Sequence, residues 1–108
     1  MKKLFVLLCL AFSTVAMAGT QTGTIGYIIV RADDGLIYFS VSGSRTGYPA
    51  CATTTQWMIK DENSNAGKQQ YAMLLAAKAS GMPIHVVGRN TCTRWSDSED
   101  VSYIMFVN

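Results

Sequence analysis

The sequence predicts a mostly β fold with one helix, in the form of a small five-stranded Greek-key barrel of the OB type. Five strand-like segments are bounded by turn signals, and one helix-like segment lies between the third and the fourth. The resulting order β-β-β-α-β-β is that of the OB-fold, a barrel that closes most of its sheet edges. An open α+β sheet contains the same elements and remains the alternative.

Residues 1–18 have the pattern of a secretory signal peptide, with Lys2 and Lys3, an apolar run and small residues before Gly19. The apolar run is too short to span a bilayer. Removing this segment leaves residues 19–108, which have the length of one domain. Seven basic residues then balance seven acidic ones, because two of the nine basic residues leave with the signal. We therefore expect a single exported domain, periplasmic or secreted, with neither a nucleic-acid partner nor a membrane span.

The first two strands are predicted over residues 24–31 and 36–41, after a loose start over 19–23. The turn Asp33-Asp34-Gly35 joins them as a hairpin. Gly26 within the first strand indicates a bend or a close backbone approach. One face of the first strand carries Ile25, Tyr27 and Ile29, and the inward residues of the second are Ile37, Phe39 and Val41.

The third strand is predicted over residues 50–60, after a Gly/Ser loop over 42–49. A helix is expected to begin near Ser64 or Asn65 and to end at Ser80, because Gly81 suits a left-handed cap and a proline follows. The fourth and fifth strands are predicted over 83–89 and 101–107, separated by a polar loop. The fifth strand is expected to carry Val101, Tyr103, Met105 and Val107 on one face, and Trp57 of the third is expected in the core.

Two cysteines remain after Cys9 leaves with the signal, and an exported chain favours a Cys51–Cys92 disulfide. The OB topology supports this pairing, because the start of the third strand and the turn before the fifth lie at one end of the barrel. Closing such a loop stabilises the fold by roughly 4 kcal/mol on the chain-entropy model. Two thiols or a metal site are the alternatives. One histidine and no Cys-x-x-Cys motif disfavour a metal, and we expect no cofactor.

The helix segment over residues 71–79 has one charge in nine residues, more apolar than a helix on a small barrel requires. One interpretation is that a second face packs on a neighbouring subunit, with Met73, Leu74 and Ala77 at the interface. The other is that alanine, the best helix former, simply covers a solvent-facing side.

Arg94 and Trp95 lie beside Cys92 in the polar loop, where an exposed ring next to hydroxyl and charged groups suits a sugar. The simpler interpretation is that Trp95 covers the barrel end and shields the disulfide. The hydroxyls of Thr53 and Thr55 suit a glycan too, although such a run is ordinary strand composition. The three nearby acids are expected to form a solvated loop rather than a calcium site: Asp97, Glu99 and Asp100.

Catalytic patterns are missing from the sequence. His85, the only histidine, lies in the middle of a predicted strand, where a half-buried and hydrogen-bonded histidine is the expected outcome. We find no nucleophile elbow, no paired-carboxylate spacing and no Gly-rich phosphate loop. We therefore do not expect an enzyme.

Several short segments occur in the order found in a known class of proteins. Ile37-Tyr38-Phe39 is followed by Ala50-Cys51-Ala52, Trp57, an Ala-rich helix ending in Ser80-Gly81-Met82-Pro83-Ile84, and Thr91-Cys92. This arrangement resembles the B subunits of the pertussis-like, subtilase-cytotoxin and typhoid-toxin class. The resemblance covers about two-thirds of the mature chain. It implies an OB-fold, a ring of five, binding of cell-surface glycans and docking of a catalytic A subunit, with the apolar helix lining the ring.

The chain departs from this class at two cysteines. Ser40 stands where those subunits usually have one, and a further cysteine after the Cys92 position is missing. Neither their disulfide pairing nor their glycan contacts transfer to this chain. The leading hypothesis is an exported, non-catalytic binding module of the toxin-B type that recognises glycans. The alternative is a small periplasmic protein that binds another protein, as an inhibitor or an envelope-stress factor.

Overall fold

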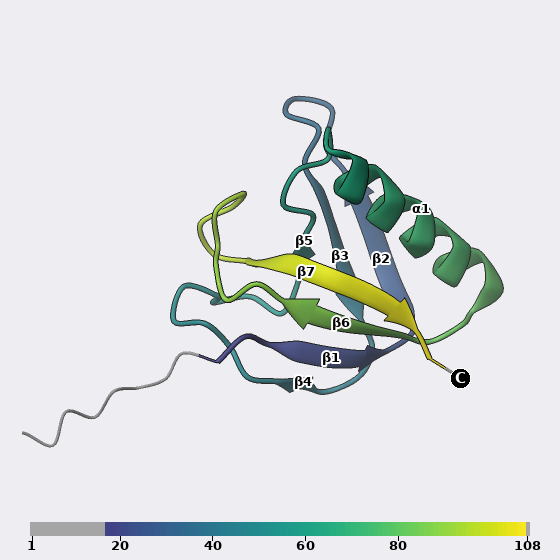
Figure 1. The fold of residues 1–108 in the computed structure, drawn as a ribbon, viewed down its shortest axis with the longest axis horizontal. Coiled ribbons are helices and arrows are strands. Elements are labelled where there is room, and N and C mark those ends of the chain that lie inside the picture. The colour runs from purple at the N-terminus through teal and green to yellow at the C-terminus, as the bar shows by residue number, and fades with distance from the viewer. Residues whose placement is uncertain (1–16, 108) are drawn as a thin grey trace, which may run out of the picture.

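The structure is a computed structural model that describes residues 17–107. The predicted signal peptide lies outside the described residues, apart from Met17 and Ala18. One curled sheet of seven strands carries one helix, which lies along β2 and β7 in Figure 1. The elements are β1 (Thr20–Gly23), β2 (Ile25–Val30), β3 (Ile37–Val41), β4 (Arg45–Thr46), β5 (Trp57–Met58), α1 (Asn65–Ser80), β6 (Ile84–Gly88) and β7 (Glu99–Phe106).

The sheet curls through the first part of the chain. β1 and β2 are separated only by Thr24, and β1 pairs with β6 while β2 pairs with β3. β5 and β7 are parallel, and the other neighbouring strands are antiparallel. The order β2-β3-β5-β7-β6-β1-β4 matches an OB-type barrel with a bent first strand. The predicted fold class, mostly β with one helix in a small barrel-like sheet, is confirmed.

Several strand boundaries differ from the prediction. The third strand is reduced from residues 50–60 to Trp57–Met58, because the preceding residues bond to a loop instead, as the Thr53 amide does with the Asp97 carbonyl at 2.9 Å. β7 begins two residues earlier than predicted, at Glu99. β1 replaces the predicted loose start, and β4 forms in the loop predicted before the third strand. These differences arise from pairing between distant segments.

A bulge in β2 changes which side chains point inward. The register of β2 against β3 shifts between Ile25 and Ile28. Gly26 lies in the bulge, where a Cβ atom would overlap the Ser40 hydroxyl, so the predicted close approach is confirmed. Ile25 and Ile28 face the core, whereas Tyr27 is 43% exposed. The prediction that Ile25 and Tyr27 share a face is wrong, because the bulge adds a residue between inward positions.

A second bulge divides the predicted face of β7. The register of β6 against β7 shifts beside Gly88. Val101 and Ile104 are buried as a result, whereas Tyr103 and Met105 are 51% and 45% exposed. The expected single face of the last strand is therefore wrong, and two large side chains lie on the outside of the sheet.

The core fills the inside of the curled sheet and the space under α1. Trp57 lies in this core, as predicted, and its indole nitrogen donates to the Gln21 side-chain oxygen at 2.8 Å. The Gln21 amide donates in turn to the Val41 carbonyl at 2.9 Å. An indole N–H without a partner would cost about 1–3 kcal/mol, so Gln21 stabilises the core. The core residues with no exposed surface are Phe39, Trp57, Ile59, Leu74, Ile84 and Val86.

The helix begins and ends where predicted. The Ser64 hydroxyl accepts a hydrogen bond from the Gly67 amide at 3.0 Å, and Gly81 closes the helix in the left-handed conformation with φ 71°. Both signals are local in sequence. Local capping therefore sets the two ends of α1.

The packing of α1 corrects the predicted subunit interface. Leu74 and Ala77 are buried in their own chain, and Met73 packs partly against the same core. These three side chains therefore pack against the core of their own chain rather than facing a neighbouring subunit. The outward side carries an apolar row at spacing i, i+3, i+4 and i+7, with Leu75 46% exposed. We call this row the outer helix stripe; it consists of Ala72, Leu75, Ala76 and Ala79.

Candidate functional site

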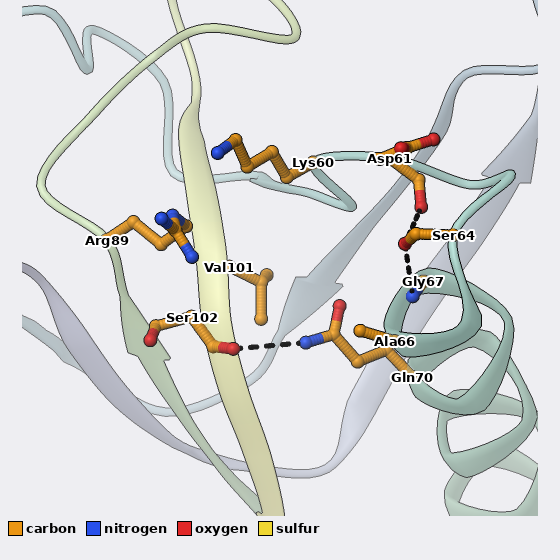
Figure 2. Close-up of a pocket in the computed structure, with 9 residues that line it drawn as sticks. All are labelled: Lys60, Asp61, Ser64, Ala66, Gly67, Gln70, Arg89, Val101 and Ser102. Atoms are coloured by element: carbon orange, nitrogen blue, oxygen red, sulfur yellow. Dashed lines mark hydrogen bonds between the residues drawn. The ribbon is translucent and has the colours of Figure 1, made fainter.

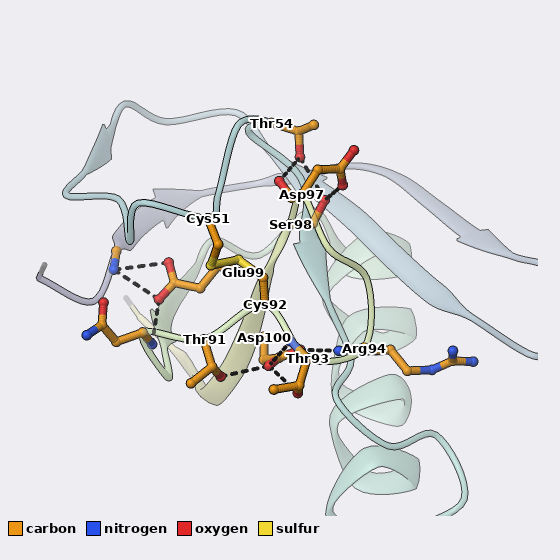
Figure 3. The surroundings of a disulfide bond; sticks show 12 residues. Cys51, Thr54, Thr91, Cys92, Thr93, Arg94, Asp97, Ser98, Glu99 and Asp100 are labelled. Atoms are coloured by element: carbon orange, nitrogen blue, oxygen red, sulfur yellow. Dashed lines mark hydrogen bonds between the residues drawn. A yellow bond between two sulfur atoms is a disulfide. The ribbon is translucent and has the colours of Figure 1, made fainter.

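A disulfide bond joins the loop before β5 to the loop before β7. Cys51 and Cys92 are bonded as predicted, with their Cα atoms 6.1 Å apart. Figure 3 shows this bond with buried carboxylates and hydroxyls around it. The segment over residues 89–98, called the β6–β7 loop below, carries the predicted site residues Arg94 and Trp95. The disulfide therefore anchors the loop that would present a ligand site.

Asp100 shapes the β6–β7 loop from beneath. Its Oδ2 accepts hydrogen bonds from the Thr91 hydroxyl at 2.7 Å, and from the Thr93 hydroxyl and amide at 2.6 and 2.9 Å. Its Oδ1 accepts from the Arg94 amide at 3.2 Å. Burial opposes the charged form, but the bonds from Thr93 and Thr91 outweigh it and lower the pKa of Asp100. An ionised, buried carboxylate thus fixes the turn before Trp95.

Glu99 makes a second buried site on the opposite face of β7. Its Oε1 accepts from the Arg45 guanidinium, and its Oε2 accepts from the Asn90 amide at 2.9 Å. The Gly19 amide lies 3.1 and 3.2 Å from the two oxygens. The side chains of Arg45 and Glu99 are 1% and 0% exposed. Burial lowers the pKa of Arg45, although the neighbouring Glu99 favours its charge.

These two carboxylates correct the expectation of a solvated acidic loop. Glu99 and Asp100 have no exposed surface. Charged residues are rarely buried unless they are paired, so an acidic cluster in a sequence is normally taken as solvent-facing. The partners here are the Arg45 guanidinium, backbone amides and threonine hydroxyls, which only the fold brings together. Among residues 17–107, no three side chains are grouped to hold a metal ion.

Arg94, predicted to contact a ligand, is paired within the chain. Its Nε and Nη2 donate to the Glu62 carboxylate at 3.1 and 2.7 Å, and Nη2 also donates to the Asp34 carbonyl at 2.9 Å. The hydrogen bonds from Arg94 lower the pKa of Glu62. Arg94 thus ties the β6–β7 loop to the turn after β2 and to the segment before α1. Its role here is to support the loop.

Trp95 lies at the surface and contacts the end of β2. It is 38% exposed, and the Arg31 guanidinium carbon lies 4.7 Å from the centroid of its ring. Arg31 is also paired with Asp34 at 3.1 Å. Alternate residues of a strand share a face, so Arg31 continues the outward row of Tyr27 and Ile29. The ring therefore borders the outer face of β2.

Two tyrosines and a glutamine extend this surface over β2 and β3. The rings of Tyr27 and Tyr38 meet edge to face, with centroids 6.2 Å apart. The Tyr27 hydroxyl donates to the Gln56 oxygen at 3.4 Å, and the Gln56 amide donates to the Ser98 hydroxyl at 3.0 Å. Gln56 thus links the tyrosines to the β6–β7 loop. We call this surface the outer-face patch; it consists of Tyr27, Arg31, Tyr38, Gln56 and Trp95.

The two threonines predicted at the site flank the patch rather than form it. Thr53 and Thr55 are exposed in the loop just before Gln56. The Thr53 amide bonds to the Asp97 carbonyl, and the Thr55 carbonyl accepts from Arg45 at 3.4 Å. Sequence analysis named neither tyrosine as a site residue. The regular alternation assumed for β2 did not include the bulge that turns Tyr27 outward. The alternation predicted for β3 left Tyr38 between inward residues and gave it no role.

A separate pocket of about 280 Å³ lies between the first turn of α1 and β7. Figure 2 shows Lys60 and Arg89 on one side and Gln70 on the other, with the Gln70 amide donating to the Ser102 carbonyl at 3.1 Å. Its volume is below the roughly 300–1,000 Å³ of typical ligand sites. It also lacks an aromatic side chain. The outer-face patch is the stronger candidate site.

His85 lies half-buried on β6, and its Nδ1 shares a hydrogen bond with the Thr22 hydroxyl at 2.6 Å. The histidine is thus hydrogen-bonded on the outer side of the sheet, as expected.

Within residues 17–107, no helix is both long and apolar enough to cross a membrane. Comparisons with protein-family models, with curated proteins and with solved structures found no match for this chain.

Proposed function

We propose that this chain is an exported, non-catalytic binding module that holds a carbohydrate on the outer-face patch. The observation that carries the proposal is the Trp95 ring, 38% exposed and fixed by Arg31, on the same outer face as the tyrosine pair. Rings with exposed faces stack on the apolar side of a sugar, while hydroxyl and amide groups beside them bond to its hydroxyls. The resemblance to toxin B subunits supports the same ligand class.

Fold analogy and charge favour a sugar over a nucleic acid. In OB barrels, the face of the second and third strands and its two flanking loops bind oligonucleotides or oligosaccharides. The corresponding parts here are β3, β5, the turn over residues 31–36 and the β6–β7 loop. The mature chain has equal numbers of acidic and basic residues, and Arg94 is paired with Glu62. A phosphate backbone would therefore gain little from this surface.

The loop that bears Trp95 is fixed before any ligand arrives. The disulfide anchors its first part, Asp100 bonds three of its residues, and Arg94 ties it to the turn after β2. A preformed loop pays little conformational entropy on binding. Such rigidity suits a shallow sugar site, where the contact area is small.

Glycan-array binding of the mature protein tests the proposal. We expect Trp95→Ala and Tyr27→Ala each to weaken binding about thirtyfold, because truncating an aromatic anchor costs about 2 kcal/mol. Tyr103→Ala is the matched control, since it removes an exposed ring from β7, outside the patch. An array without hits, or binding that Trp95→Ala leaves unchanged, would exclude the carbohydrate proposal.

We also propose that copies of the chain associate through the outer helix stripe. Its alanines permit close approach of another helix, and Leu75 supplies a large apolar side chain, 46% exposed. The resemblance implies a closed ring of five with a catalytic A subunit docked on it. Association would place several sugar sites on one particle, which compensates for weak single sites.

A second candidate function is binding of another exported protein, as an inhibitor or an envelope-stress factor. The exposed Tyr103 and Met105 on β7 favour it, because tyrosine and methionine are enriched at protein interfaces. Affinity capture from an envelope extract with wild type and Met105→Glu tests it. A single stoichiometric partner that Met105→Glu fails to capture supports this function. Equal recovery by both proteins would count against it.

A further inference from the structure

Gly19 follows the predicted cleavage point directly, yet it lies in a buried charge cluster. Its amide nitrogen is 3.1 and 3.2 Å from the two carboxylate oxygens of Glu99, and its carbonyl accepts from the Gly88 amide at 2.9 Å. Gly19 is buried, whereas Met17, two residues earlier, is 67% exposed. Burial of the chain therefore begins at the residue that the signal pattern predicts as the mature N-terminus.

The site accepts only glycine at this position. A Cβ atom on Gly19 would lie 2.7 Å from Glu99 Oε1, 2.8 Å from Arg45 Nε and 2.8 Å from the Gly47 carbonyl oxygen. Real Cβ atoms do not approach other atoms so closely. The main-chain nitrogen of residue 19 is thus held against the carboxylate with no room for a side chain.

The Glu99 carboxylate can accept more hydrogen bonds than the donors around it supply. A peptide amide has one hydrogen, which Gly19 shares between two oxygens at nearly equal distances. Arg45 is the cation of the cluster, and its Nη2 donates to Oε1 of the same carboxylate. A buried ion pair is favourable only when further hydrogen bonds complete it. A three-hydrogen donor at the Gly19 nitrogen would complete this one.

We propose that cleavage of the Ala18–Gly19 peptide bond converts the Gly19 nitrogen into an α-ammonium that binds Glu99 in this buried site. Hydrolysis adds one water, which leaves a carboxylate on Ala18 and an ammonium on Gly19. The ammonium then donates separately to the two oxygens, and each contact gains the attraction between opposite charges, whereas in the amide only the acceptor is charged. Removal of the signal peptide is thus a step that completes the fold.

The test compares residues 19–108 with a free α-amine and the same chain acetylated at Gly19, both with the disulfide formed. All strands and the helix lie within this range. Acetylation restores the neutral amide and leaves the neighbouring side chains identical in the two proteins: Glu99, Arg45 and Tyr48, whose ring centroid lies 4.6 Å from the Arg45 guanidinium carbon. We expect the free amine to raise the thermal midpoint at pH 6 by about 4 °C or more. Glu99 favours the charged amine, so this advantage is present at low pH and falls as the amine deprotonates above about pH 8.

Equal midpoints at pH 6 would overturn the proposal. A difference that stays constant up to pH 10 would overturn it too, because it would reflect the bulk of the acetyl group. N-terminal sequencing of the exported protein should begin at Gly19, and any other start contradicts the assignment. In Glu99→Gln the free amine should lose its advantage. If that variant does not fold, the acetylation comparison decides alone.

Discussion

Two adjacent residues, Glu99 and Asp100, serve different sites because neighbours on a strand point to opposite faces. Glu99 faces Arg45 and Gly19, and Asp100 faces the β6–β7 loop with Thr91. Both carboxylates have no exposed surface. A few hydrogen bonds to buried charges therefore hold Gly19 and the Trp95 loop at the beginning of β7.

Asp100→Asn is expected to lower the free energy of unfolding at pH 7 by about 2 kcal/mol, because an amide cannot accept all four hydrogen bonds. The folded pKa of Asp100 is lowered, so its contribution is present above the unfolded pKa of about 3.9 and is lost at lower pH. Urea unfolding of both proteins should therefore differ at pH 7, and the difference should shrink as the pH falls below about 3.9. The exposed Asp33→Asn is the control and should stay within about 0.5 kcal/mol. Equal stability of Asp100→Asn and wild type at pH 7 would contradict this role.

At the residue scale, the sequence was informative where one residue type has few possible partners. The predicted mature chain has two cysteines, which leave one intramolecular pairing, and the Cys51–Cys92 bond is observed. Arg94 and Glu99 have many possible partners in the sequence, and the ones they find lie 32 and 54 residues away. The binding role predicted for Arg94 was inferred from its position next to Trp95. In the structure, Arg94 instead pairs with Glu62 and the Asp34 carbonyl.

At the element scale, the limits of helix α1 could be predicted to within a residue, whereas the limits of the strands could not. Ser64 and Gly67 are three residues apart, so the cap is visible in the sequence. The ends of β5 depend on β3 and β7, which are far away in sequence, and only Trp57–Met58 pairs with them. The bulge beside Gly26 likewise decided that Tyr27 joins the outer-face patch. Strand limits and bulges depend on register, which local propensity does not determine.

Gly67→Ala tests how tertiary contact overrides helix propensity. In an open helix this change stabilises by about 1 kcal/mol. Here a Cβ atom would overlap the Asp61 carbonyl oxygen, because the chain before α1 folds against its first turn. We therefore expect a loss of about 1–3 kcal/mol, measured by urea unfolding. Lys68→Ala, exposed in the same turn, should change stability by less than about 0.5 kcal/mol. A gain in stability for Gly67→Ala would show that the first turn can move away.

At the scale of the whole molecule, the Cys51–Cys92 bond spans 41 residues and links the loops at one end of the sheet. Cys92→Ser is expected to cost about 4 kcal/mol, most of the stability of a small domain, while the fold persists at low temperature. Thermal unfolding measures the loss. The double variant Cys51→Ser/Cys92→Ser should match the single one, which assigns the effect to the bond. If the thermal midpoints of Cys92→Ser and wild type agree within error, the disulfide does not stabilise the fold as predicted.

Self-association is the remaining whole-molecule prediction, and it depends on the side of α1 that the core does not use. Leu74 faces the core, whereas Leu75 points outward with Ala72, Ala76 and Ala79. We expect the mature protein to sediment as a closed oligomer and Leu75→Glu to sediment as a monomer, because a buried, unpaired carboxylate at the interface is costly. The Leu75→Glu monomer should have a thermal unfolding midpoint close to that of the wild-type protein at low concentration, because Leu75 is not part of the core.

Gln69→Glu is the matched control for this experiment. It adds the same charge to an exposed position one turn before the outer helix stripe, so it should leave the oligomer intact. Native mass spectrometry gives the subunit number. Five subunits would support the resemblance to toxin B subunits. A closed oligomer with another number of subunits would support association through the outer helix stripe but would contradict that resemblance. A wild-type protein that is monomeric at all concentrations would exclude both self-association through the stripe and the ring of five. The glycan array would still test the function of the outer-face patch, because Leu75 and Trp95 lie on different elements.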